Sequence, residues 1–173
     1  MRLFVAVEVP EVIRMKLGAL GSSIRQDGVV PVGAENMHIT LRFIGETEEA
    51  DEIAAKLAQV RFKAIDCVVA NVGVFPNPEY IKVVWAGIQS QNGLEGLAQD
   101  VSGSLKDLGG DERFSPHITI ARVRRKMDLS RFLKENERQA FGSFRVSSFR
   151  LMRSELGPGG PKYTIIADFK AED

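Results

Sequence analysis

Apolar residues recur along this chain with two different periods, which predict an ordered succession of strands and helices. Runs rich in β-branched and aromatic residues predict strands at residues 3–9, 37–44, 64–75, 81–88, 117–123, 144–152 and 163–169. Helical spacing of apolar residues predicts helices at residues 11–26, 46–60, 92–108 and 129–139. Between these elements, breakers are expected at Pro10, Gly45, residues 76–78, Gly109-Gly110 and residues 157–161. Loops are expected at residues 28–36, with a short extended piece at Val29-Val30, and at residues 111–116.

The order of elements repeats itself. A strand, a helix, a second strand, a second helix and a third strand recur about 80 residues further along the chain. The repeat predicts an internal duplication within a single domain covering residues 1–173, with lobes at roughly 1–78 and 79–173. A pseudo-twofold axis between the lobes would bring the second strand of each repeat to a shared cleft.

Those two strands carry the same short motif, His38-Ile39-Thr40-Leu41 and His117-Ile118-Thr119-Ile120, which contains both histidines of the chain. Residues i and i+2 of a strand point to the same face. Each strand therefore presents an imidazole and a hydroxyl side by side, with aliphatic residues behind them. A single motif of this length is usually structural. Two facing copies would supply a general acid, a general base and two hydrogen-bond donors.

Composition narrows the class of protein. Apolar residues make up 44% and charged residues 27% of the chain, which is typical of a globular protein. The formal net charge is zero, so binding to duplex nucleic acid by bulk positive charge is not expected. The single cysteine, Cys67, is expected to be buried. Because there is neither a signal-peptide pattern nor an apolar run of roughly 20 residues, we expect a cytoplasmic protein that is not in a membrane. No feature requires more than a monomer.

At this point the sequence resembles the 2H phosphoesterase family, and most closely its RNA 2′,3′-cyclic phosphodiesterase branch, also called 2′-5′ RNA ligase. The resemblance is carried by RLFVAVEVP at 2–10, ENMHITLRFIG at 35–45, GVFPNP at 73–78, VWAGI at 84–88 and FSPHITIARV at 114–123. It implies a bilobal α+β fold in which two antiparallel sheets flank a central cleft. It also implies chemistry without a metal or cofactor, with RNA ends bearing a 2′,3′-cyclic phosphate as substrates; tRNA fragments are one candidate.

Hydrolysis of a cyclic phosphodiester requires a base to activate water and an acid to protonate the departing sugar oxygen. Histidine suits both tasks because its ordinary pKa is about 6.5. Thr40 and Thr119 could donate hydrogen bonds to the phosphate oxygens. The spacing does not say which histidine has which role. The resemblance implies that His38 is the proton donor, that His117 is the acceptor and that the phosphate stays on the 2′ oxygen.

Two arginines compete for a role in phosphate binding. Regular alternation places Arg42 on the same face as His38, and places Arg122 on the face opposite His117 unless the strand bulges or ends there. The resemblance nevertheless favours Arg122. For both, a solvated charge at the strand end is the alternative.

Aromatic and basic residues are candidates for holding RNA. Phe75, Phe114 and Tyr163 could stack on bases, although core packing is the commoner role for each. A basic stretch follows the second motif and could contact upstream phosphates; it consists of Arg122, Arg124, Arg125, Lys126 and Arg131.

Three rival interpretations stay open. The same two histidines could run the reverse reaction, which joins a 2′,3′-cyclic end to a 5′-hydroxyl. A non-catalytic module that binds RNA ends would need neither an acid nor a base. A zinc site could use His38, His117 and acidic residues, but the sequence has no second ligand at the usual short spacing.

Overall fold

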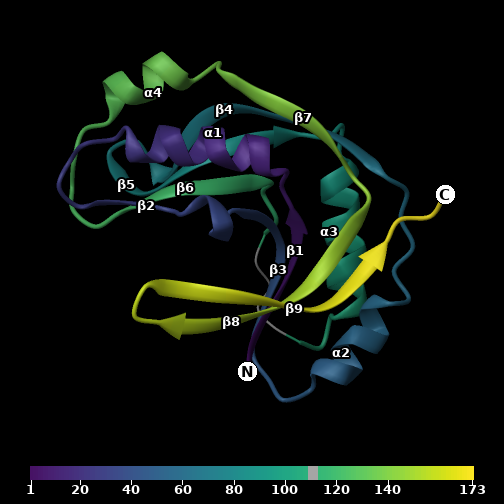
Figure 1. Ribbon diagram of the computed structural model, residues 1–173. Helices are drawn as coiled ribbons and strands as arrows, with labels where there is room; N and C mark the ends of the chain where they lie inside the picture. Colours follow the sequence, from purple (N-terminus) through teal and green to yellow (C-terminus); the bar gives the residue numbers. More distant parts are fainter. Residues whose placement is uncertain (109–112) are drawn as a thin grey trace.

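The computed structural model describes residues 1–108 and 113–173, which form a mixed α+β fold (Figure 1). The expected helix stop at Gly109-Gly110 and the start of the expected loop at 111–116 lie outside these residues. The strands are β1 (Arg2–Glu8), β2 (Val29–Pro31), β3 (His38–Glu46), β4 (Ile65–Asn77), β5 (Tyr80–Gln89), β6 (His117–Val123), β7 (Ala140–Val146), β8 (Ser148–Gly157) and β9 (Gly160–Lys170). The helices are α1 (Glu11–Ser22), η1 (Ala34–Asn36), α2 (Ala50–Leu57), α3 (Gly93–Ser104) and α4 (Ser130–Asn136).

The strands form two antiparallel sheets, as the resemblance implied. One sheet has the order β3-β1-β8-β9 and the other the order β2-β6-β5-β4-β7. The two strands that carry the histidine motif, β3 and β6, are neighbours in space, and they join the two sheets at this point. In Figure 1, the β8–β9 hairpin of the first sheet extends beneath β2 and β6 of the second. The predicted two-sheet α+β fold is therefore confirmed.

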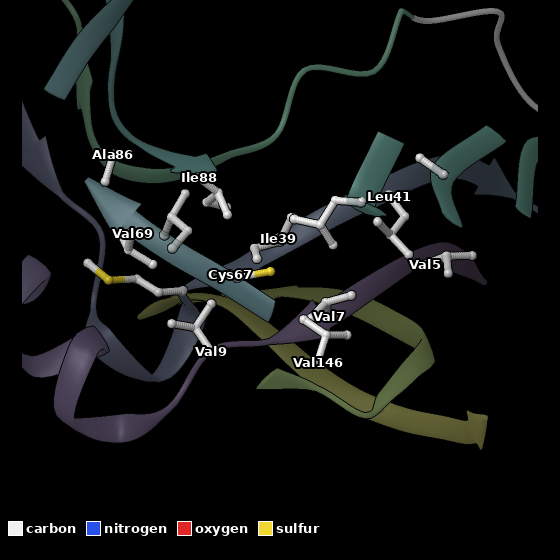
Figure 2. Packing of buried hydrophobic residues seen from close by; sticks show 14 of the residues in the cluster. Val5, Val7, Val9, Ile39, Leu41, Cys67, Val69, Ala86, Ile88 and Val146 are labelled. Carbon is white, nitrogen blue, oxygen red and sulfur yellow. The ribbon is translucent and has the colours of Figure 1, made fainter. Parts of the chain in front are cut away.

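A single apolar core connects the two sheets and their helices. Side chains from most of the strands are buried in it, among them Val5, Val7, Ile39 and Leu41 (Figure 2). Cys67 lies within this cluster and is 1% exposed, which confirms the expected burial. Burial raises the pKa of the Cys67 thiol to about 11, because the charged thiolate is poorly solvated there.

The predicted strand at 144–152 is wrong as a single element. The chain leaves the five-stranded sheet with β7, passes Ser147 and enters the four-stranded sheet with β8. Val146 and Phe149 are both buried although they are three positions apart, an odd spacing that one regular strand cannot bury on one face. Because only Ser147 separates the two strands, the composition of this stretch predicts one continuous strand.

Each sheet also contains strands from both sides of the expected lobe boundary near residue 78. β4 precedes that boundary but pairs with β5, whereas β8 follows it but pairs with β1. Neither sheet is therefore built from one half of the chain alone. The division into lobes at 1–78 and 79–173 stays a prediction about the repeat in sequence, since the sheets do not divide there.

The helices are shorter than their apolar patterns suggested. α2 begins at Ala50 rather than near residue 46, because β3 continues through Glu46 and pairs there with Arg2. α1 packs on β6 and β7 of the five-stranded sheet, while α3 packs on β3 and β4. Among the described residues, none of the helices combines the length and apolar character needed to cross a bilayer.

Candidate active site

The two motif strands present their histidines and threonines as the alternation predicted. His38 and Thr40 are half-buried on β3, while Ile39 and Leu41 are in the core. On β6 the half-buried residues are His117 and Thr119, with Ile118 and Ile120 behind them. The pattern arises because a pleated strand packed on one face must expose every second residue to the other side.

Both imidazoles are held by the same local hydrogen bond. Nδ1 of His38 lies 2.9 Å from the backbone oxygen of Asn36, and Nδ1 of His117 lies 2.8 Å from that of Ser115. A carbonyl oxygen can only accept, so Nδ1 carries the proton in each ring. In the neutral form this leaves Nε2 with a free lone pair. Each ring can therefore take up or release a proton at Nε2.

Aromatic rings fix the planes of both imidazoles. His38 lies 4.9 Å from the ring of Phe4 and 5.1 Å from that of Tyr163, which meets it edge-on. Phe75 meets His117 edge-on at 5.1 Å between ring centres. Such edge-to-face contacts restrict rotation about the side-chain bonds and exclude water from one side of each ring.

The charges of the site act on one another across the two sheets. Burial, together with the nearby positive charges of His117 and Arg122, lowers the pKa of His38 to about 4, although the bond to Asn36 opposes these effects. Burial also raises the pKa of the Tyr163 phenol, an effect that the charges of Arg122 and Arg2 oppose. His38, His117, Arg122 and Tyr163 thus share one electrostatic environment, although they come from β3, β6 and β9.

A register shift decides which arginine faces this site. Trp85 pairs with Thr119 but its neighbour Val84 pairs with Ala121, so β6 has one extra residue at Ile120. Ile120 and Ala121 are consecutive and both buried, which inverts the alternation and places the exposed Arg122 on the face of His117. This bulge is the exception under which the sequence allowed Arg122 to share the face of His117.

The corresponding register shift in β3 places Arg42 on the face opposite His38. Ala6 pairs with Thr40 and Val5 with Arg42, so Leu41 is the extra residue. The Arg42 guanidinium donates from Nη2 to the backbone oxygens of Leu105, at 3.4 Å, and Leu108, just beyond the end of α3. The prediction from regular alternation, that Arg42 shares the face of His38, is wrong. Its charge instead interacts with the carbonyl end of a helix.

Two aromatics that could have stacked on bases are engaged within the protein. Phe114 packs against the core, and the ring of Phe75 lies between His117 and Trp85, at 5.3 Å from the latter. The indole of Trp85 lies over Gly73, where an added Cβ would clash with the ring. Gly73 is thus the residue that lets Trp85 lie flat on β4.

Phe4 and Trp85 are residues of the site that the sequence reasoning missed. Phe4 lies within a continuous apolar run, Leu3 to Val7, in which periodicity cannot show which residue faces the cleft. Trp85 could have been found, because it is the only tryptophan and lies within the VWAGI block.

The basic stretch after β6 is partly engaged in ion pairs. Arg125 contacts Asp27 at 2.8 Å and Arg131 contacts Glu135 at 3.0 Å, and all four side chains are exposed. Such exposed pairs are weak. In the described part of the chain, no three His, Cys, Asp or Glu side chains converge as a metal site requires.

A cavity of about 190 Å³ opens beside His38 and is lined by Ala6, Glu8, Met152 and Tyr163, among others. A larger groove of about 830 Å³ lies between β4, β7 and the start of α3. Neither histidine lines the larger groove, so its size does not make it the reactive site. The smaller cavity is the one that a catalytic candidate, His38, borders.

Comparisons with known proteins find similar sequences and similar folds. The family profile described as the 2′-5′ RNA ligase superfamily matches residues 11–158. The RNA 2′,3′-cyclic phosphodiesterase of Archaeoglobus fulgidus is 38% identical, over 98% of this chain and 100% of its own length. The structure of TT0787 from Thermus thermophilus superposes with a TM-score of 0.81 at 30% identity, covering 98% of this chain and 97% of that one. Apo LigT of Escherichia coli superposes with a TM-score of 0.81 at 25% identity, covering 99% and 98%.

Proposed function

This chain belongs to the 2′-5′ RNA ligase superfamily, and we propose that it hydrolyses the 2′,3′-cyclic phosphate at RNA ends, tRNA fragments among them, to a 2′-phosphomonoester. The observation that carries this proposal is the pair of imidazoles, each held through Nδ1 by a backbone oxygen so that Nε2 is available. Relatives named RNA 2′,3′-cyclic phosphodiesterase support the reaction class. A solved relative at 25% identity, LigT of E. coli, is complexed with phosphate.

The reaction is an in-line displacement at phosphorus. Nε2 of His117 removes a proton from water as the water oxygen forms a bond to phosphorus. The bond from phosphorus to the 3′ oxygen breaks on the opposite side, and Nε2 of His38 donates a proton to that oxygen. The phosphate remains on the 2′ oxygen, and a second turnover requires the two imidazoles to exchange protons with solvent. Each histidine is expected to contribute about 10²–10⁴-fold.

The other polar groups act on the phosphate itself. Thr40 and Thr119 lie on the same strand faces as the histidines, where their hydroxyls can donate to the non-bridging oxygens. Arg122 supplies the positive charge that a dianionic transition state favours. No step of this scheme requires a metal ion, since the imidazoles transfer the protons and the arginine stabilises the charge.

The low pKa of His38 has a consequence for its role as an acid. At neutral pH and without substrate, an imidazole with a pKa of about 4 is uncharged and has no proton to donate at Nε2. A bound phosphate anion opposes the two causes, burial and positive neighbours, by adding a negative charge beside the ring. Substrate binding is therefore coupled to proton uptake by His38 in this scheme.

RNA ligation is the second candidate. The same two imidazoles can join a 2′,3′-cyclic end to a 5′-hydroxyl, which replaces water as the nucleophile. Nε2 of His117 takes the proton of that hydroxyl, the bond from phosphorus to the 3′ oxygen breaks, Nε2 of His38 protonates the 3′ oxygen, and a 2′-5′ phosphodiester forms. The name of the superfamily is the observation in its favour.

The test uses a short RNA ending in a 2′,3′-cyclic phosphate, with the product identified by phosphorus NMR in excess EDTA. Wild type should yield a 2′-phosphomonoester, and His38→Ala and His117→Ala should each lose about 10²–10⁴-fold in rate. Circular dichroism of both variants controls for folding. Tight binding without turnover by wild type would favour the binding module, and turnover only without EDTA would revive the zinc site. A 3′-phosphate product would overturn the assigned regiochemistry.

A further inference from the structure

The cavity beside His38 has a floor built from β1, β8 and β9. Thr40, Ala6, Arg150 and Asp168 lie in one cross-strand row, from β3 to β9. Ala6 is the small member of that row, and it lines the cavity together with Arg150. Since neighbouring strands are about 4.8 Å apart, Arg150 lies roughly 10 Å from Thr40 along the row.

Two carboxylates hold the guanidinium of Arg150, whose side chain is only partly buried. Its Nη1 lies 3.0 Å from a carboxylate oxygen of Glu8, and its Nε lies 3.1 Å from one of Asp168. Hydrogen bonds to a guanidinium lie in its plane, so these two contacts occupy edges of the group. The side chain is 26% exposed and is on the strand face opposite the buried Phe149 and Leu151.

We propose that this cavity is a subsite for the base of the terminal nucleoside, which stacks on the guanidinium face of Arg150. Met152 and Ile165 supply apolar walls, and Tyr163 borders the cavity at the side of His38. The volume, about 190 Å³, is below the roughly 300–1,000 Å³ of pockets for drug-sized ligands, so it suits one base rather than a dinucleotide. Because every base has a π face, stacking of this kind accepts all four bases.

The position of the cavity fits the proposed reaction, on which this inference rests. Both oxygens of the cyclic phosphate belong to the terminal ribose, and the attacking water approaches from the opposite side of phosphorus. The nucleoside must therefore lie on the side of the acid that protonates the leaving oxygen. His38 borders the cavity and is the cross-strand neighbour of Glu8, whereas His117 does not line it.

The experiment compares a substrate with a base and one without. Adenosine 2′,3′-cyclic phosphate and the 2,3-cyclic phosphate of methyl ribofuranoside share the reacting group but differ in the base. The first variant is Arg150→Lys, which keeps a positive charge for Glu8 and Asp168 but removes the planar face. Its matched control is Arg145→Lys, because Arg145 on β7 also donates from Nε to a cross-strand aspartate, Asp66, at 2.9 Å, but does not line the cavity.

Arg150→Lys should raise KM for the adenosine substrate about tenfold and leave KM for the base-free substrate unchanged. Arg145→Lys should change neither. The variant Arg150→Met should behave like Arg150→Lys, since neither has a planar group. An equal rise for both substrates, or no rise for either, would overturn the stacking subsite.

A binding measurement separates this inference from the proposed reaction. Calorimetry with adenosine 2′-monophosphate and with methyl ribofuranoside 2-phosphate requires no turnover. If wild type hydrolyses neither cyclic substrate, the proposed reaction fails, but about tenfold weaker binding of the adenosine ligand alone by Arg150→Lys would still support the subsite. Equal affinity of wild type for the two ligands would exclude it.

Discussion

The two motif strands are alike locally but differ in what surrounds them. His38 and His117 make the same bond from Nδ1 to the backbone oxygen two residues earlier, and each strand has an extra residue after its threonine. After the bulge, however, β6 presents Arg122 where β3 presents Phe43, which is 54% exposed and lies 6.4 Å from Phe4. One side of the site therefore carries a cation and the other carries aromatic rings and a cavity.

This difference suggests how a duplicated site serves an asymmetric substrate. A nucleotide has a charged end and a flat, largely apolar end. The side of Arg122 suits the phosphate and the attacking water, whereas the side of Phe4, Tyr163 and the cavity suits the nucleoside. The two motifs supply two imidazoles in equivalent local settings, and in the proposed reaction the residues around them make their roles unequal.

The largest effect is expected from substitutions at the two positions after the bulge. Arg122→Ala should lower kcat/KM about 10²-fold, because it removes a donor and a positive charge at the transferred phosphate. Phe43→Ala should change kcat/KM much less, since Phe43 adds no charge there. Steady-state kinetics on a short RNA ending in a 2′,3′-cyclic phosphate provides the measurement. Equal losses in the two variants would contradict the assignment of the phosphate to the side of Arg122.

A smaller effect is expected on stability in acid. His38 has a folded pKa of about 4, against about 6.5 for an unfolded histidine, so the unfolded chain takes up the proton first as the pH falls. The stability that neutral His38 contributes is present above pH 6.5 and is lost progressively down to about pH 4. Because the ring is half-buried, we expect about 2 kcal/mol rather than the full value of the shift.

Urea denaturation at pH 7 and pH 4.5 would measure that loss. Wild type should lose more free energy of unfolding on acidification than His38→Asn does, while the contribution of all other titrating groups is common to both proteins. The same loss in both would show that His38 is solvated in the folded protein.

The smallest effect is expected at the arginine that the site does not use. Arg42→Met should lower the free energy of unfolding by about 1 kcal/mol, because the carbonyls of Leu105 and Leu108 lose their charged donor. It should leave KM nearly unchanged, in contrast to Arg122→Ala. Thermal unfolding and kinetics on the same preparation test both statements. A large rise in KM with unchanged stability would place Arg42 at the substrate after all.

Local sequence was sufficient for the elements and for the two histidine–threonine pairs, since those depend only on residue type and a period of two. It was insufficient wherever the backbone departs from that period. The extra residues at Leu41 and Ile120 exchanged the faces of Arg42 and Arg122, and the break at Ser147 divided one predicted strand between two sheets. Bulges depend on how neighbouring strands pair, and pairing partners are not encoded in the spacing of a single strand.

The sequence by itself determined the doubled His-Ile-Thr motif, the alternation that puts an imidazole beside a hydroxyl, the buried Cys67 and the family to which the chain belongs. Only the tertiary structure decided that Phe4 and Tyr163 enclose His38, that Arg122 reaches the site and that Arg150 lies beside a cavity. The physical reason is distance along the chain. Residues from β1, β3, β6, β8 and β9 meet because two sheets share one core, and burial, charge and register at their junction are properties of the whole fold.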